Sequence, residues 1–383
     1  KIAPQYDGDV VVYVPDASRS VAVVTQLVGQ GKAQFVRDIH EEYIVVRERV
    51  ANRKPREKEL RYAEAVANAP QFDWDAYQPP RPTFIGTRVF DHFPLAELVD
   101  TIDWTPFFIT WELSGKFPAI LEDDVVGAQA RELYQDAQAM LKRIVDEKLL
   151  TAKAVVGFWP ASRSGTDDIA VYADESRTEA IAILHHLRQQ TEKPDGKYNA
   201  SLADYVAPAG SGAEDYIGGF CVTTGHGVEE LAAEFLAQHD DYNSILLKSL
   251  ADRLAESFAE YLHRMVRREL WGYAPDETLS VSELIQEQYR GIRPAPGYPA
   301  CPDHTEKATL FKLLNATKAC DVTLSESYAM SPPSSVSGFY FSHPESRYFA
   351  VGKIGRDQVE SLAGRKGETV TEIERWLRPN LSY

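Results

Sequence analysis

Hydrophobic residues recur every three or four positions along several stretches of the chain, which is the spacing of one face of an α-helix. The longest stretch is 244–270, with apolar positions at Leu246, Leu250, Leu254, Phe258, Tyr261, Met265 and Val266. Other stretches predict helices at 21–52, 124–149, 176–190, 228–238, 358–365 and 370–377, and a short helix following 103–108.

Runs of β-branched and aromatic residues predict strands between these helices. They lie at 10–14, 155–160, 169–172, 216–223, 322–324, 335–341 and 348–353. The strands and helices come in irregular order, without repeated β-α-β units, which argues against a doubly wound nucleotide-binding fold. We therefore predict the α+β class: a single large domain with a twisted, largely antiparallel sheet and surrounding helices.

Composition excludes several classes of partner. The 383 residues carry a formal net charge of −16, which argues against nucleic acid and anionic membrane, since both attract basic surfaces. There is no signal peptide at 1–16 and no apolar run near the ~20 residues that a bilayer span requires. Three scattered cysteines, Cys221, Cys301 and Cys320, form no C-x-x-C pair, which favours a reducing cytoplasm. Because Lys1 is not an initiator methionine, we expect the chain to be a piece of a longer polypeptide.

The motifs of common nucleotide and metal sites are missing from the sequence. It contains no G-x-G-x-x-G after a strand, no G-x-x-x-x-G-K-[ST] phosphate loop and no H-E-x-x-H zinc motif. The one adjacent histidine pair, His185-His186, lies in the predicted helix 176–190, where successive side chains point about 100° apart. Such a pair is poorly placed to share one metal ion, so we predict no metal site.

An unusual segment, Gly291–Lys307, has four prolines in the nine positions from Pro294 to Pro302. Proline fixes φ and pushes the preceding residue towards extended geometry, so the segment should be stiff and drawn out. Its backbone groups would be unpaired by any sheet and free to contact a ligand, and Gly297 would let that ligand approach closely. A proline-rich spacer explains the same residues equally well.

The particular residues of this segment distinguish the two interpretations. R-P-A-P-G-Y-P-A-C-P-D-H-T-E-K at 293–307 resembles the S-adenosylmethionine (AdoMet) signature in the activation domain of cobalamin-dependent methionine synthase. Other blocks resemble the same family, in the family's order, at 16–19, 102–108, 187–190, 251–256, 337–342 and 373–377. The resemblance therefore extends over nearly the whole chain.

The resemblance implies a C-terminal module that holds AdoMet for the reductive remethylation of cob(II)alamin. The parent enzyme would transfer methyl from methyltetrahydrofolate to homocysteine, with cobalamin carried by a neighbouring domain of the same polypeptide and an electron from a flavodoxin-type donor. Residues 1–20 would be a linker and first strand from the cobalamin-binding region, and 21–383 the AdoMet-binding activation domain. The chain alone is not expected to make methionine, and the resemblance implies no acid–base catalytic residue.

The resemblance also assigns AdoMet contacts residue by residue. Arg293 matches the family's arginine ligand, and its planar, permanently charged fork suits the AdoMet carboxylate. Asp103 matches a carboxylate that would contact the ammonium group, although a helix cap before Thr105 is the alternative role. The other expected contacts are Ala295, Gly297, Tyr298, Tyr348 and Phe349. Phe349 lacks the hydroxyl that the family often has there, and core packing in a strand is the alternative for both aromatic residues.

Three residues are candidates for a face towards a partner domain or cobalamin: Asp252, Glu256 and His304. For Asp252 and Glu256 the cationic ligand is a further possibility. Asp252, Glu256 and Glu260 lie four residues apart in the predicted helix 244–270 and form a stripe of like charge. A solvated helix face explains the stripe as well.

Two other function classes remain open at this point. One is a free-standing AdoMet-dependent methyltransferase acting on a small molecule, against which the missing glycine-rich motif counts. The other is a ligand-free interaction module in which the proline-rich segment is a spacer. A docking site for an acidic electron donor would need a local basic patch, for which the candidates are Lys116 and the cluster Arg264, Arg267 and Arg268.

Overall fold

The structure is a computed structural model that describes residues 10–14, 17–29, 31–51 and 58–383. The chain divides into two compact units, Lys1–Lys58 and Glu59–Tyr383. The predicted domain boundary at residue 20 stays a prediction.

The described part of the first unit is helical. It contains α1 (Ala17–Val28) and α2 (Lys32–Ala51), where the sequence predicted one helix over 21–52. Gly29 and Gly31 lie between the two helices, and glycine is costly in a helix interior. The strand predicted at 10–14 is wrong, because these residues form no sheet pairing in the structure. Their β-branched composition favours a strand, yet none of the described residues forms a second strand that pairs with them.

The second unit is built on an antiparallel sheet. Its strands are β1 (Gly86–Phe93), β2 (Thr151–Ser164), β3 (Asp168–Tyr172), β4 (Ala180–His185), β5 (Asp215–His226) and β8 (Ser335–Tyr340). The strand order is β4-β3-β2-β5-β8, and β1 pairs with the same edge of β2 as β3 does. A separate two-stranded ribbon joins β6 (Thr323–Leu324) to β7 (Met330–Ser331).

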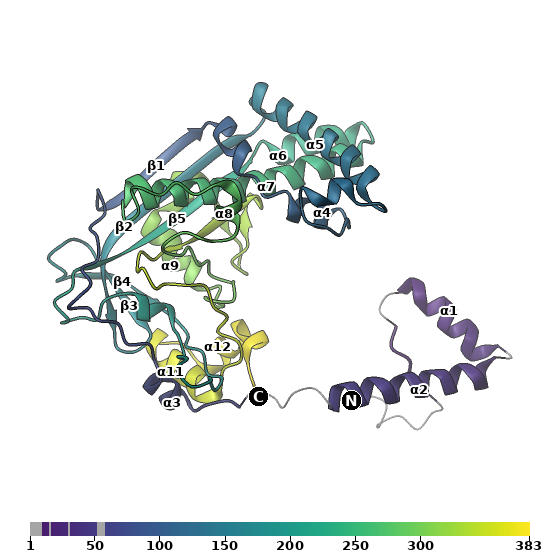
Figure 1. Ribbon diagram of the computed structural model, residues 1–383, viewed down its shortest axis with the longest axis horizontal. Coiled ribbons are helices and arrows are strands. Elements are labelled where there is room, and N and C mark those ends of the chain that lie inside the picture. Colours follow the sequence, from purple (N-terminus) through teal and green to yellow (C-terminus); the bar gives the residue numbers. More distant parts are fainter. Residues whose placement is uncertain (1–9, 15–16, 30, 52–57) are drawn as a thin grey trace. The chain divides into compact units, whose positions relative to one another are not determined.

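Helices surround this sheet. Those of the second unit are α3 (Tyr62–Ala67), α4 (Thr105–Thr110), α5 (Gly127–Asp146), α6 (Val228–Ala237), α7 (Asp241–Met265), α8 (Val281–Ile285), α9 (Glu306–Leu314), α10 (Ala316–Cys320), α11 (Arg356–Lys366) and α12 (Val370–Trp376). Short 3-10 turns complete the unit at Leu95–Thr101, Ala119–Glu122, Leu202–Tyr205 and Arg378–Asn380. In Figure 1, α4 to α7 gather beyond one end of the long strands, whereas α3, α11 and α12 gather near β3 and β4.

The two faces of the sheet carry separate hydrophobic cores, because successive residues of a strand point to opposite faces. Val156 and Phe158 of β2 belong to the core that includes residues of α5, α6 and α7. Val155 and Trp159 of the same strand belong to the core that includes residues of α9 and α10. The α+β class with a largely antiparallel sheet is therefore confirmed, and α7 spans the first core as the longest described helix.

Two predicted elements are wrong. The helix predicted at 176–190 is instead β4, whose Ala182 and Leu184 pair with Val171 and Ile169 of β3. Alanine, glutamate and leucine in this stretch favour a helix, and pairing with β3 overrides that local preference. The strand predicted at 348–353 is irregular, since the Val351 N–H bonds the carbonyl of Pro299 at 2.8 Å rather than a strand. No described helix is long and apolar enough to cross a membrane.

Candidate functional site

The proline-rich segment runs beside β8 before it turns away from the sheet. Ile292 exchanges two backbone hydrogen bonds of 3.0 Å with Phe341, and the Phe339 N–H bonds the Pro294 carbonyl at 2.9 Å. The turn that follows is closed internally, because the Gly297 N–H bonds the Cys301 carbonyl at 2.7 Å. The expectation that these backbone groups are unpaired by a sheet is thus wrong at Ile292 and Pro294. The pairing fixes the start of the segment on the sheet and so fixes the direction of Arg293 between them.

A pocket of about 450 Å³ opens beside this segment. Its volume lies within the range of small-molecule sites, roughly 300–1,000 Å³. The predicted site residues that line it are Arg293, Ala295, Tyr298, Tyr348, Phe349 and Glu256, and the other lining residues are Glu287, Pro294, Pro299, Ala300 and Val336. The pocket therefore brings together residues from four places: α7, the segment 287–300 that follows α8, strand β8, and residues 348–349.

Arg293 is held by two hydrogen bonds. Its Nη2 donates to the Glu260 carboxylate at 2.8 Å, and its backbone N–H donates to the Tyr348 hydroxyl at 3.0 Å. Its Nε is buried and has no hydrogen-bond partner among the described residues. A buried donor without a partner is costly, by about 1–3 kcal/mol. Because Arg293 also lines the pocket, its guanidinium is placed to bind an additional acceptor there, and a carboxylate is the group whose geometry matches it best.

Two carboxylates stand on the walls of the same pocket. Glu256 lies one helical turn before Glu260 on α7, and Glu287 follows α8 with a positive φ of 55°. Burial raises the pKa of Glu287 above its ordinary value, although the nearby Arg293 opposes that rise. Glu256 was predicted to face a partner domain or the cationic ligand, and the structure places it on the pocket wall. Nothing in the sequence signalled Glu287, because a lone glutamate in a loop is normally a solvated residue.

The aromatic residues contribute surface and one anchoring hydroxyl. Tyr348 is partly buried and its hydroxyl lies 3.3 Å from that of Tyr289, while Phe349 packs against two hydrophobic clusters. Tyr298 is 59% exposed at the pocket's edge. The segment that holds Tyr348 and Phe349 is not a strand, and both residues line the pocket while also packing against the core on that face of the sheet.

Gly297 and His304 support the turn and are not among the residues that line the pocket. Gly297 has a φ of 97°, and a Cβ added to it would lie 2.2 Å from Cε1 of His304. The His304 Nδ1 lies 3.1 Å from the Nζ of Lys307. The imidazole ring therefore packs directly against the glycine, which explains why no side chain fits there. That His304 faces cobalamin stays a prediction.

Asp103 lies in a different hollow from Arg293. This second pocket, of about 750 Å³, is lined by Asp103, Lys116 and Gln286 among others, and Gln286 is the chain neighbour of Glu287 in the first pocket. The Asp103 carboxylate accepts the Thr105 N–H at 3.0 Å, which is the capping role considered as its alternative. Its predicted contact with the ligand stays a prediction. Asp252 lines neither pocket; it is exposed and accepts a hydrogen bond from Ser334 at 2.5 Å.

The second half of the signature anchors the loop to α11. The Nζ of Lys366 donates to Asp303, Thr305 and Glu306, each at 2.7 Å. Thr305 immediately precedes α9, but its side chain makes no capping bond. Instead, the Asp303 carboxylate accepts the Thr305 N–H at 2.9 Å. Asp303 and Glu306 therefore have a structural role: they attach the loop to α11 through Lys366.

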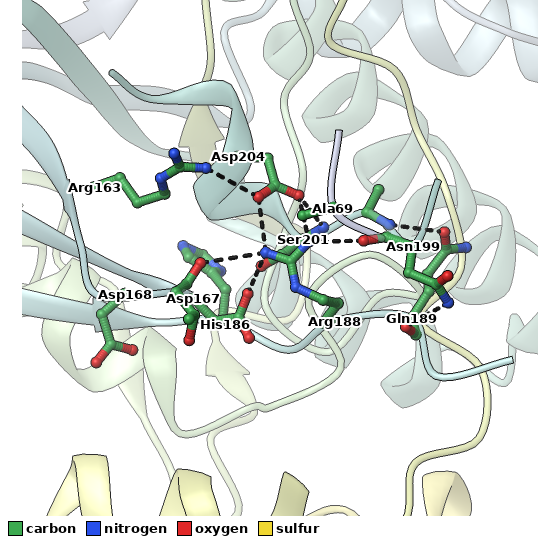
Figure 2. Close-up of polar contacts among 12 residues, drawn as sticks. Ala69, Arg163, Asp167, Asp168, His186, Arg188, Gln189, Asn199, Ser201 and Asp204 are labelled. Carbon is green, nitrogen blue, oxygen red and sulfur yellow. Dashed lines mark hydrogen bonds and ion pairs between the residues drawn. The ribbon is translucent and has the colours of Figure 1, made fainter. Parts of the chain in front are cut away.

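Figure 2 shows a second polar cluster, around Arg188, which we considered as a ligand site and which the contacts argue against. Arg188 is 1% exposed and its Nη atoms donate to Asp167 and to both carboxylate oxygens of Asp204, at 2.6–2.8 Å. The same nitrogens also bond the carbonyls of Asn199 and Thr166. Its Nε is also buried without a hydrogen-bond partner among the described residues, but its charge is matched inside the protein and it lines neither of the two pockets above. We assign it to holding β3, β4 and the following loops together.

The described residues contain no group of three or more His, Cys, Asp or Glu side chains arranged to hold a metal ion. His185 and His186, predicted on a helix, lie at the end of β4 and just after it. His185 bonds Asp168 through Nδ1 at 3.0 Å, whereas His186 is buried with neither ring nitrogen partnered.

Comparisons with known proteins agree with this geometry. A family model described as the activation domain of vitamin B12 dependent methionine synthase matches residues 94–367. A solved structure described as the MetH reactivation domain bound to AdoHcy is 56% identical to this chain, with a TM-score of 0.82. The match covers 85% of this chain and 99% of that chain.

Proposed function

Because the chain belongs to the family of vitamin B12-dependent methionine synthase activation domains, we propose that its Arg293 pocket binds S-adenosylmethionine for the remethylation of cobalamin. The proposal rests on one observation above all. Arg293 lines a pocket of ligand size with a buried Nε that lacks a partner among the described residues. The AdoHcy bound by the 56% identical reactivation domain is AdoMet without its methyl group.

The groups on the pocket walls match the three parts of AdoMet. The Arg293 guanidinium suits the carboxylate of the amino-acid tail, and Glu256 or Glu287 suits the ammonium group. Tyr298, Tyr348 and Phe349 offer apolar faces to the adenosine. Ala295 and Gly297 would contribute backbone contacts, although the Gly297 N–H is already bonded within the turn.

Bound AdoMet would supply a methyl group to reduced cobalamin held by a neighbouring domain of the same polypeptide. This displacement needs no general base, so the chain's own residues act by orienting the ligand and excluding water. The family places the chain in a methyltransferase enzyme, and we infer that the chain by itself makes no methionine.

We infer a flavodoxin-type protein as the electron donor. Of the basic residues considered for its docking, Arg267 is ruled out, because it is 0% exposed and bonded to Glu277 at 2.7 Å. Arg268 and Lys116 are exposed and remain candidates. A cytoplasmic location, favoured by the cysteine pattern, also remains a proposal.

The test is calorimetric titration of the purified chain with AdoMet and with AdoHcy. We expect both to bind the native chain, and Arg293→Ala to weaken each by about 10–100-fold, because a charged hydrogen bond contributes ~1.5–3 kcal/mol. Arg268→Ala, at an exposed site, is the matched control and should bind normally. Absence of binding to the native chain would refute the proposal, as would an Arg293→Ala variant with native affinity.

The other two function classes are less well supported. A ligand-free interaction module does not account for a preformed pocket around an incompletely bonded arginine. A free-standing methyltransferase for a small acceptor does not account for family membership over residues 94–367.

A further inference from the structure

Behind the pocket, four charged side chains form a buried row that ends at Arg293. Glu277 binds the Nε and Nη2 of Arg267 at 2.7 and 2.8 Å. Arg267 reaches one oxygen of Glu260 at 3.5 Å, and the other oxygen of Glu260 accepts the Arg293 Nη2 at 2.8 Å. Of these four residues only Arg293 lines the pocket. The other three therefore fix the position of the Arg293 guanidinium from the interior.

The row is closed into a ring by aromatic residues. The Arg267 guanidinium lies 4.3 Å from the centre of the Tyr289 ring. The Tyr289 hydroxyl lies 3.3 Å from that of Tyr348, which in turn accepts the backbone N–H of Arg293 at 3.0 Å. Both the side chain and the backbone of Arg293 are therefore fixed by the same closed set of contacts.

Glu260 and Arg267 belong to one helical stretch that changes type between them. α7 ends at Met265 and continues as a π-helical turn over Val266–Leu270, which contains Arg267. A π-helical turn shifts side chains relative to the α-helical register and is common at functional sites. In an α-helix, residues seven apart lie on nearly the same face, so Glu260 and Arg267 already share one side of the helix.

Glu260 could act on a ligand carboxylate in two opposite ways. As a nearby anion it could repel the ligand, or as an acceptor it could hold Arg293 in the orientation that the ligand needs. The contacts favour the second effect, because Glu260 binds Nη2 of Arg293 from outside the pocket lining, while Arg293 itself lines the pocket. Glu260 is also shared with Arg267, so two guanidinium groups offset its charge.

We propose that Glu260 is the positioning residue that fixes Arg293 for the carboxylate of the bound amino-acid tail. This inference rests on the proposed function, since it concerns the same ligand in the same pocket. Glu260 is buried on α7 and is not among the residues that line the pocket, so its effect is exerted through Arg293.

Two ligands separate positioning from a general structural role. AdoHcy carries the amino-acid tail, whereas 5′-methylthioadenosine has the same nucleoside thioether and no tail. We expect Glu260→Gln to weaken AdoHcy by about tenfold or more, which corresponds to ~1.4 kcal/mol, and to change the affinity for 5′-methylthioadenosine by less than about twofold. Glu269→Gln, at an exposed position of the same π-helical turn, is the control and should leave both affinities unchanged.

The outcomes are distinguishable from failure of the proposed function. If the native chain does not bind AdoHcy, the proposed function fails and Glu260 is irrelevant. If the native chain binds and Glu260→Gln binds AdoHcy as well or better, the positioning role is overturned. Equal losses for both ligands also overturn it, because they indicate collapse of the pocket. Should Glu260→Gln not fold, Glu277→Gln carries the same test one contact further back, with a smaller loss expected for AdoHcy alone.

Discussion

Glu287 is a single residue whose protonation should control the charge of the pocket. Burial raises its pKa, so as pH falls it gains a proton before an ordinary glutamate does and loses its attraction for a cation. We expect the affinity for AdoMet to fall as the pH is lowered from about 7 towards 4.5, the ordinary pKa of a glutamate, and to fall less steeply in Glu287→Gln. AdoHcy lacks the sulfonium charge and should show the smaller difference. Titrations of both ligands across this range test the idea, and identical pH profiles for the native and variant chains would contradict it.

His186 should make the stability of the protein depend on pH. Burial holds its pKa down to about 3, against an ordinary value of 6.5, and both ring nitrogens lack partners among the described residues. Its folded-state pKa is depressed, so between pH 6.5 and 3 the unfolded chain binds the extra proton and stability is lost as pH falls.

We expect the native chain to lose about 2 kcal/mol more of its unfolding free energy than His186→Leu does on going from about pH 7 to pH 5. Urea denaturation at the two pH values measures the difference. Equal losses in both proteins would show that His186 is protonated in the folded state.

At the scale of single residues, the sequence predicted the site best for residues that lie close together along the chain. Arg293, Ala295 and Tyr298 share one stiff segment, so their residue types predicted a common pocket. Glu287 could not be predicted, because its position depends on how the turn after α8 meets that segment. Asp103 was chosen because a carboxylate suits the ammonium group of the ligand, but the structure places it in the second pocket and not beside Arg293.

The turn at Gly297 is an element whose geometry admits only glycine. An alanine there would adopt an unfavourable φ of 97° and place its Cβ 2.2 Å from the His304 ring. We expect Gly297→Ala to lower the unfolding free energy by roughly 1–3 kcal/mol. Adding His304→Ala should recover the part of this loss that comes from the ring contact.

Gly364 provides the matched control for this change. It lies inside α11, and a Cβ added to it meets nothing within 4 Å. Gly364→Ala should therefore stabilise the helix, by about 0.5–1 kcal/mol. Urea denaturation of the two single variants gives the comparison, and a neutral Gly297→Ala would show that the turn can rearrange.

At the scale of elements, long periodic stretches were predictable and short edge elements were not. The spacing of Leu246, Leu250 and Leu254 predicted α7 because one side of that helix is fully buried in the core. β4 was mistaken for a helix because its alanine and leucine residues suit both structures, and only pairing with β3 decides between them. The π-helical turn after Met265 left no mark in the apolar spacing, since Val266 and Leu270 suit an α-helix equally well.

At the scale of the whole molecule, the pocket belongs entirely to the second compact unit. Every residue that lines it lies within Glu59–Tyr383, as do Glu260 and Arg267. We expect a chain of residues 59–383 to unfold cooperatively and to bind AdoHcy within about twofold of the full chain. Calorimetric titration and thermal denaturation of the two chains test this. A marked loss of affinity in the shorter chain would mean that 1–58 contributes to the site.

The overall α+β class was predictable because it follows from the order of elements, and the order survives small errors in their bounds. The pairing of β1 and β3 with successive parts of one edge of β2 was not predictable. This pairing depends on the full length of β2, whose 14 residues reach both β1 and β3. The sequence pattern predicted only the apolar centre of that strand, at 155–160.

Lys366 binds Asp303, Thr305 and Glu306, so the second half of the segment 293–307 serves the stability of the protein, whereas the first half lines the pocket. Substitutions in the two halves should therefore cause different defects. Inherited or engineered changes at Arg293, Ala295 or Tyr298, which line the pocket, would leave a well-expressed protein that no longer saturates with its ligand. Changes from Asp303 onwards would give a heat-sensitive protein whose yield recovers when cells are grown in the cold. Growth temperature alone could then sort variants of one short motif into two kinds of defect.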